Sequence, residues 1–247
     1  AETDAHYPVA VGVIGDIRHS LDRIAQLTTP HQGAHVRPMR ERLVREMDQH
    51  REDLEFPVKP QKIIWDLRTA LDLEDIVVCD VGAHKMWMAR MFRCEYPNTC
   101  IISNGFASMG IAVPGAIAAK LVYPQRHVVA VTGDAGCMMN SQEIETAMRC
   151  KLPIVILIWN DSSYGLIEWK QMNQFQRSSN VHFNNPDFVA YAESFGARGY
   201  RIERTADLPS ILEEALANDT VSIIDCPVDY RENIKLTDQL GTLVCPT

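Results

Sequence analysis

The 247-residue sequence lacks the features that mark several common classes of protein. No apolar run approaches the ~18 residues of a membrane-spanning helix, and no signal-peptide pattern is present. Positive charge is in short supply, because 24 Lys and Arg stand against 32 Asp and Glu, for a net charge of −8. An acidic balance spread along the chain argues against nucleic acid as a partner. We therefore expect a globular cytoplasmic protein with neither a membrane nor a nucleic-acid partner.

Paired cysteine spacing is absent as well. The seven cysteines include no CxxC and stand mostly in apolar runs, which is typical of reduced core residues in a cytoplasmic protein. Cys137 is the best candidate for a functional thiol, but packing is its expected role because no basic residue or His lies near it in sequence. The chain begins AETDAH rather than with Met, which we interpret as a fragment, a processed chain or a trimmed chain.

From residue 60 onward, apolar runs alternate with amphipathic helical patterns. This alternation predicts an α/β fold, a doubly wound, mostly parallel six-stranded sheet with helices on both faces. The expected strands are 75–80, 99–103, 127–134, 153–161, 198–202 and 221–227. The expected helices are 60–71, 84–92, 106–122, 141–150, 186–195 and 207–217, and the segment after Asp161 is expected to be irregular.

The beginning of the chain does not continue this pattern. Residues 8–15 predict one strand, and residues 17–27 predict one helix with Asp16 as its N-cap. A single βα unit cannot bury its own apolar face, so it is interpreted as the end of another domain. The expected division is residues 1–29 as the end of a middle domain, 30–59 as a linker and charged helix, and 60–247 as the main domain.

Two expected strands end in a carboxylate. Asp134 follows HVVAVTG, and Asp161 follows PIVILIWN 27 positions later. Ligands bind at the carboxyl ends of strands in an open parallel sheet, so both side chains are expected at one site. Either residue alone is most simply a turn or N-cap Asp. The pair suits a hard cation such as Mg²⁺ that also binds a phosphate.

Small residues and a histidine accompany these carboxylates. Gly133 and Gly136 would let backbone N–H groups approach an anion at a helix start. His84 follows a strand and a Gly82 turn, where it could donate a hydrogen bond to a phosphate oxygen, although a lone His is more often a capping residue. Met109 stands among small residues, where it could support a ring or simply belong to the core.

Five segments, in order, resemble the C-terminal half of the acetolactate synthases. They are GAHKMW, SNGFASMGIAVPGAIAA, TGDAGCMMNSQEIETA, WNDSSYG and PDFVAYAESFGA, and the tail VDYRENIKL resembles the catabolic type in particular. This family uses thiamine diphosphate and Mg²⁺ to condense two pyruvate molecules into 2-acetolactate and CO2. Ala135 replaces the second Gly of the family's GDG signature, and Asp161 stands where many members carry Asn.

The resemblance implies a role for individual residues. Mg²⁺ would be held by Asp134, Asp161 and the Ser163 carbonyl. Met109 would support the bent cofactor, so that the cofactor's own amino group can deprotonate the thiazolium carbon. The substrate side would be lined by Leu166, Ile167 and Trp169. The other implied cofactor contacts are Gly82, Ala83, His84, Ser108, Gly133, Ala135, Gly136 and Tyr164.

The resemblance also implies that this chain holds half of an active site. Family members carry an N-terminal pyrimidine-binding domain with the activating Glu, and they form at least homodimers. The chain alone is therefore expected to be inactive. The use of FAD is left open, because most of the flavin-contacting middle domain is outside this sequence. Two alternatives remain: another 2-keto acid decarboxylase or carboligase of the same family, and a non-catalytic cofactor-binding subunit.

Overall fold

The computed structural model describes residues 8–29, 33, 36–233 and 236, and the chain divides into two compact units, 1–44 and 45–247. In the first unit, helix α1 (Ile17–Leu27) begins after Asp16, whose Oδ1 accepts the N–H of His19 at 2.8 Å. The strand expected at residues 8–15 is wrong, since this segment has irregular backbone. A lone strand has no neighbour to complete its hydrogen bonds.

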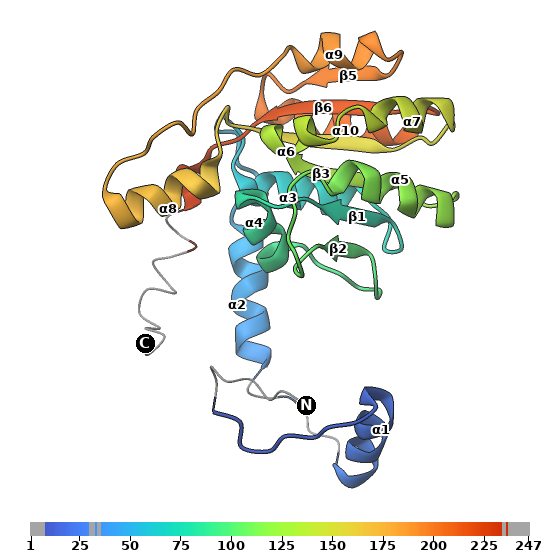
Figure 1. The fold of residues 1–247 in the computed structure, drawn as a ribbon, viewed down its shortest axis with the longest axis vertical. Coiled ribbons are helices and arrows are strands. Elements are labelled where there is room, and N and C mark those ends of the chain that lie inside the picture. Colours follow the sequence, from blue (N-terminus) through green and yellow to red (C-terminus); the bar gives the residue numbers. More distant parts are fainter. Residues whose placement is uncertain (1–7, 30–32, 34–35, 234–235, 237–247) are drawn as a thin grey trace. The chain divides into compact units, whose positions relative to one another are not determined.

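The second unit contains a six-stranded, entirely parallel sheet in the order β2-β1-β3-β4-β6-β5 (Figure 1). The strands are β1 (Ile76–Cys79), β2 (Cys100–Ile102), β3 (Val128–Gly133), β4 (Val155–Asn160), β5 (Arg198–Arg201) and β6 (Ser222–Pro227). All six expected strands are confirmed. The chain passes from β1 to β2 on one side and then to β3 on the other, so the strand order reverses between β1 and β3. Ligands bind at such a reversal.

Helices cover both faces of this sheet (Figure 1). The helices of the second unit are α3 (Pro60–Ala70), α4 (Ala83–Met91), α5 (Ala112–Val122), α6 (Asp134–Met139), α7 (Glu143–Arg149), α8 (Gly165–Phe175), α9 (Phe188–Ser194) and α10 (Leu208–Ala217). Helix α2 (Arg37–Asp48) contains the division between the two units. Leu67, Trp87 and Leu212 belong to the apolar layer formed by α3, α4 and α10. Ile144 and Phe188 belong to the layer on the other face. Within the described residues, no helix is long and apolar enough to cross a membrane.

Two helices differ from the sequence expectation. Helix α5 begins at Ala112 rather than near Phe106, because Ala107 and Gly110 have φ values of 55° and 86° that interrupt a helix. Helix α8 occupies part of the segment expected to be irregular after Asp161. Its apolar side chains are spread around the helix and none is buried, so the sequence shows no single apolar stripe by which a helix is recognised.

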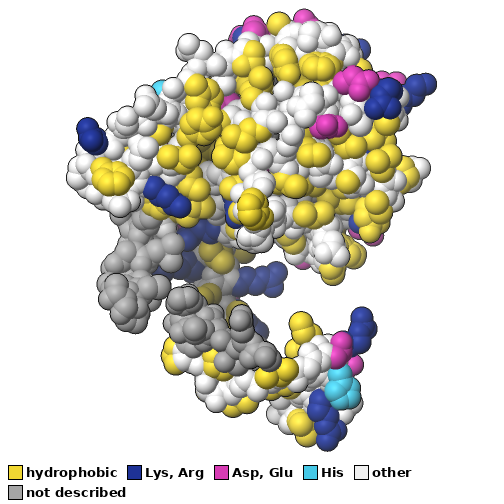
Figure 2. Space-filling model, in the orientation of Figure 1, with side chains coloured by type: hydrophobic (Ala, Val, Ile, Leu, Met, Phe, Trp, Pro, Cys, Tyr) yellow, Lys and Arg dark blue, Asp and Glu magenta, His cyan; other side chains and the backbone are white. Residues whose placement is uncertain are grey.

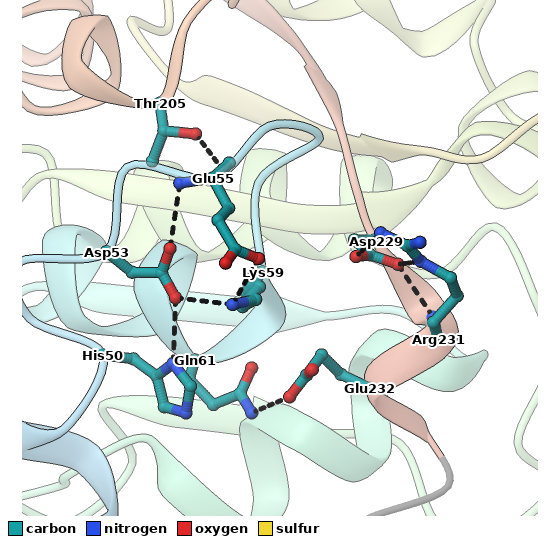
Figure 3. Close-up of polar contacts among 9 residues, drawn as sticks. All are labelled: His50, Asp53, Glu55, Lys59, Gln61, Thr205, Asp229, Arg231 and Glu232. Atoms are coloured by element: carbon teal, nitrogen blue, oxygen red, sulfur yellow. Dashed lines mark hydrogen bonds and ion pairs between the residues drawn. The ribbon is translucent and has the colours of Figure 1, made fainter.

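A polar cluster lies in the segment before α3, and Gln61 in the first turn of α3 contacts the turn that follows β6 (Figure 3). Lys59 Nζ lies 2.8 Å from Asp53 Oδ2 and 2.7 Å from Glu55 Oε2. Gln61 Nε2 donates to Glu232 Oε2 at 2.8 Å. Glu232 belongs to the 3₁₀ turn Tyr230–Asn233, which borders the cavity described below. The Gln61 side chain therefore links α3 to the turn that carries Tyr230.

The cysteines match the sequence expectation in part. Cys79, Cys137 and Cys226 are buried, whereas Cys94 and Cys150 are exposed. Burial raises the pKa of the Cys137 thiol to about 12, which agrees with a packing role. Cys245 lies outside the described residues.

Candidate functional site at the carboxyl ends of three strands

A cavity of about 220 Å³ lies at the carboxyl ends of β1, β3 and β4. It is bordered by the turns after these strands, the loop before α5, the first turn of α8 and the 3₁₀ turn after β6. Its position matches the reversal of strand order between β1 and β3. The lining residues foreseen from the sequence are Gly82, Ala83, His84, Met109, Gly133, Asp134, Ala135, Gly136, Asp161, Ser163, Tyr164, Leu166 and Ile167.

Two foreseen residues are not part of this lining. Ser108 is exposed and is absent from the cavity wall, although its neighbours Ala107 and Met109 contribute to it. Trp169 lines an adjoining, more open hollow that shares Asp161 and Ser163 with the cavity. The hollow thus continues the cleft along α8.

Asp134 is the first residue of α6 and is 1% exposed. Its Oδ1 accepts the N–H of Ala135 at 2.8 Å. Its Oδ2 accepts the N–H of Ser162 and the side-chain amide of Asn185, each at 2.7 Å. Burial raises the pKa of Asp134 and these hydrogen bonds oppose the rise. Neutral donors from two loops therefore hold this carboxylate in place.

Asp161 stands in the turn after β4. Ser163 Oγ donates to Asp161 Oδ2 at 2.8 Å, and a Cβ on Gly165 would lie 2.8 Å from the same oxygen. Burial raises the pKa of Asp161 to about 7 against the Ser163 hydrogen bond, and the charge of Asp134 adds to the rise. Among the described residues, neither carboxylate has an ion-pair partner. Two carboxylates thus lie close together without a balancing charge.

This arrangement fits a hard divalent cation. The carboxylates and the Ser163 carbonyl proposed from the sequence would offer only oxygen ligands, which Mg²⁺ prefers. In the described part of the chain, no group of three or more His, Cys, Asp or Glu side chains is suited to hold a metal. Water and ligand oxygens would therefore complete an octahedral shell, as is common where Mg²⁺ binds a phosphate.

The sequence analysis considered His84 as a capping residue at a helix start, but the structure shows that its side chain is buried. It is 2% exposed, its ring makes a hydrogen bond to the backbone of Asp80, and its Nε2 has no partner. Burial lowers the pKa of His84 to about 4, against the nearby charge of Asp80. A Cβ on Gly82 would lie 2.7 Å from His84 Cε1, so the glycine leaves room for this ring. An unpartnered ring nitrogen at the cavity wall suits a bound polar group.

The sequence analysis did not assign a role to several residues of the site, among them Asn185, Tyr230 and Asp80. Asn185 contacts Asp134, and Tyr230 lines the cavity with its ring centroid 6.3 Å from that of Trp159. Nothing local in the sequence marks either residue, because long-range folding brings them to the site. Asp80 lies beneath the cavity and could have been found, since it follows a buried strand as Asp134 and Asp161 do.

Comparison with known proteins agrees with this geometry. Residues 80–226 match the family model described as thiamine pyrophosphate enzyme, C-terminal TPP binding domain. An acetolactate synthase of Bacillus subtilis (strain 168) is 46% identical over 177 residues, which cover 72% of this chain and 31% of that protein. A catabolic acetolactate synthase of Raoultella terrigena is 34% identical over 246 residues, covering 97% of this chain and 44% of the relative.

A third relative extends the comparison to a large subunit. Isozyme 3 of acetolactate synthase from Escherichia coli (strain K12) has a large subunit that is 31% identical over 241 residues, covering 91% of this chain and 41% of that protein. The chain therefore spans less than half the length of these relatives. The expected resemblance to the acetolactate synthases is confirmed. The chain belongs to the thiamine pyrophosphate enzymes and carries their C-terminal TPP-binding domain.

Proposed function

We propose that this chain is the part of an acetolactate synthase that holds the diphosphate of thiamine diphosphate through Mg²⁺. The observation that supports this most strongly is the pair Asp134 and Asp161, two largely buried carboxylates without a counter-charge at the ends of adjacent parallel strands. When bound, thiamine diphosphate supplies the carbon nucleophile that adds to a 2-keto acid. The residues of this chain bind and orient that cofactor.

The cofactor contacts follow from the cavity wall. Asp134, Asp161 and the Ser163 carbonyl would hold Mg²⁺, with the diphosphate completing its shell. Helix α4 begins at Ala83, so its positive end and the backbone at Gly82 would face the phosphates. The other proposed diphosphate contacts are His84, Gly133, Ala135, Gly136 and Tyr164, and Ser108 would approach only from outside the lining.

The apolar part of the cleft would receive the ring and the substrate. Met109 lies on the loop before α5, and Leu166 and Ile167 lie in the first turn of α8. These side chains would exclude water and hold the ring, and Trp169 would border the adjoining hollow. The named activity of the relatives favours pyruvate as the substrate, with 2-acetolactate and CO2 as the products.

The cleft would be completed by a second domain, in the same chain or in a partner subunit of a homo-oligomer. Figure 2 displays many hydrophobic side chains on the face that carries α5 and α7. On elements that border the cavity, Phe106 is 97% exposed, and Met138, Met139 and Ile167 are also exposed. An N-terminal pyrimidine-binding domain would cover such a surface and supply the activating Glu.

Calorimetric titration of the chain with thiamine diphosphate tests this proposal. We expect binding in the presence of Mg²⁺ and at least ~10-fold weaker binding with a chelator, because the cation neutralises two carboxylates and the phosphates. Inorganic diphosphate is expected to bind with Mg²⁺ as well, whereas thiamine without phosphates is not. Absence of any Mg²⁺-dependent binding of thiamine diphosphate would refute the proposal.

A further inference from the structure

Asp80 is a fully buried carboxylate whose partners come from three separate segments. It follows β1, and its Oδ1 accepts the N–H of Val81 at 2.7 Å. The N–H of Gly110 lies 2.9 Å from Oδ1 and 3.0 Å from Oδ2, and Thr132 Oγ1 donates to Oδ2 at 3.0 Å. These three donors are neutral. The carboxylate therefore joins the end of β1 to the loop before α5 and to β3.

Gly110 is held at both its N–H and its carbonyl. Its N–H donates to Asp80, and its carbonyl accepts the side-chain amide of Asn140 at 2.9 Å. Its φ of 86° favours glycine, and a Cβ there would lie 2.8 Å from Asn140 Nδ2 and 3.0 Å from Met139 Cβ. Because Met109 is the preceding residue and lines the cavity, fixing Gly110 fixes Met109 as well.

Asp80 also contacts the parts of the cavity wall that belong to α6 and α4. A Cβ on Gly136 would lie 3.0 Å from both Asp80 Oδ2 and Thr132 Oγ1. The ring of His84 makes its hydrogen bond to the backbone of Asp80. Contacts with Asp80 therefore locate parts of the wall that come from the loop before α5, from α6 and from α4.

From this geometry, and resting on the proposed function, we propose that Asp80 is a positioning residue of the cofactor cleft. It is not one of the lining residues, so it acts through others. It holds Met109 in place through the backbone of Gly110. It also sets how closely the backbone of α6 at Gly136 approaches the Asp80 and Thr132 side chains. A buried carboxylate suits this task because each oxygen can accept more than one hydrogen bond.

Three variants of the chain test this inference. Asp80→Ala removes the acceptor, so amide hydrogen exchange around Gly110 is expected to rise at least ~10-fold and Mg²⁺-dependent binding of thiamine diphosphate to weaken about 10-fold. Asp80→Asn is expected to restore both, since its carbonyl can accept from Gly110 while its amide donates to Thr132. The control is Asp75→Ala, which removes another buried carboxylate.

Asp75 is a matched control because it stands just before the opposite end of β1. It is 4% exposed, and it accepts the N–H groups of His127 and Asp72, each at 2.8 Å. Asp75→Ala is expected to lower thermal stability, as Asp80→Ala does, but to leave exchange at Gly110 and cofactor affinity at wild-type values. Cofactor affinity thus separates positioning from a general loss of stability.

The results that would refute this inference differ from the results that would refute the proposed function. Wild-type exchange at Gly110 or wild-type affinity in folded Asp80→Ala overturns the inference, even where the wild-type chain binds the cofactor. If the wild-type chain binds no cofactor, the proposed function fails, and exchange at Gly110 still decides whether Asp80 holds the loop. Should Asp80→Ala not fold, exchange in the wild-type chain still decides, because the inference requires the Gly110 N–H to be protected by Asp80. A Gly110 N–H that exchanges as fast as a solvent-exposed amide overturns the inference.

Discussion

Burial shifts the pKa values of two residues of the cleft, Asp161 and His84. Asp161 and His84 both have pKa values shifted toward the neutral form, to about 7 and about 4. The common cause is the loss of hydration of the charged form. A bound cation would stabilise the Asp161 carboxylate, and a bound phosphate would stabilise a protonated His84. The proposed cation and phosphate would therefore each stabilise the charged form of one of these residues.

His84 is expected to remain neutral down to a pH of about 4 in the ligand-free chain. Its folded pKa lies below the unfolded value of about 6.5. Its contribution to stability is therefore present above pH 6.5 and is lost as the pH falls toward 4. Titration of the His84 ring by NMR measures this directly. A midpoint near 6.5 would contradict the burial argument.

Gly165→Ala tests the close approach of α8 to Asp161. The new Cβ would lie 2.8 Å from Asp161 Oδ2, so the carboxylate must move. Because alanine is also a better helix former than glycine by about 1 kcal/mol, overall stability is expected to change little. Mg²⁺-dependent cofactor binding is expected to weaken by ~10-fold in calorimetry. Gly105→Ala is the control, since nothing lies within 4 Å of a Cβ there, and equal affinities of the two variants would refute the account.

At the scale of elements, the parallel sheet was predictable and the loops were not. Strands covered on both faces are continuous apolar runs, so β3 and β4 were evident with Asp134 and Asp161 at their ends. Helix α8 buries no side chain, and Asn185 reaches Asp134 only through the fold. Local sequence contains no signal for contacts of that kind. This explains why the residues that follow the strands were foreseen with their chemistry, whereas Asn185 and Tyr230 were not.

The polar cluster before α3 is expected to stabilise the second unit in a pH-dependent way. Burial alone would raise the pKa of Asp53, but hydrogen bonds from Lys59, the Glu55 N–H and His50 hold it at about 2. Since the unfolded value is about 3.9, the stabilisation is present above pH 4 and is lost as the pH falls toward 2.

Asp53→Asn is therefore expected to lower the free energy of unfolding by on the order of 1–2 kcal/mol at pH 7, and by roughly half as much at pH 3. Urea unfolding at the two pH values measures the difference. Glu52→Gln is a surface control from the same segment, with its side chain 88% exposed, and is expected to stay within ~0.5 kcal/mol of wild type. An Asp53→Asn effect that is independent of pH would contradict the assignment.

At the scale of the whole molecule, the proposed function makes this chain the diphosphate-binding side of a cleft that a further domain would complete. The chain spans less than half the length of its relatives, and apolar side chains stay exposed on elements that border the cavity. The six-stranded sheet was foreseen from the alternation of apolar runs with helical patterns, and the family was foreseen from the order of five sequence segments. The exposed apolar side chains beside the cavity were not foreseen, because exposure depends on which side chains the fold leaves uncovered.

The isolated chain is expected to form no 2-acetolactate from pyruvate. Fused behind the N-terminal portion of a relative, it is expected to do so, because the activating Glu and the rest of the cleft are then present. Product formation by colorimetric assay measures both. Activity of the isolated chain would contradict the account, and an inactive fusion that binds cofactor would favour a non-catalytic cofactor-binding subunit.

The most direct test of the central claim is calorimetry of thiamine diphosphate with Mg²⁺ on three proteins: wild type, Asp134→Ala and the surface control Asp219→Ala. Asp134 is buried at the cleft, whereas Asp219 is exposed in the turn before β6. We predict Mg²⁺-dependent binding by wild type and Asp219→Ala, and at least ~10-fold weaker binding by Asp134→Ala, because a charged ligand to the cation is lost. Equal affinity of Asp134→Ala and wild type would contradict the proposed Mg²⁺ site.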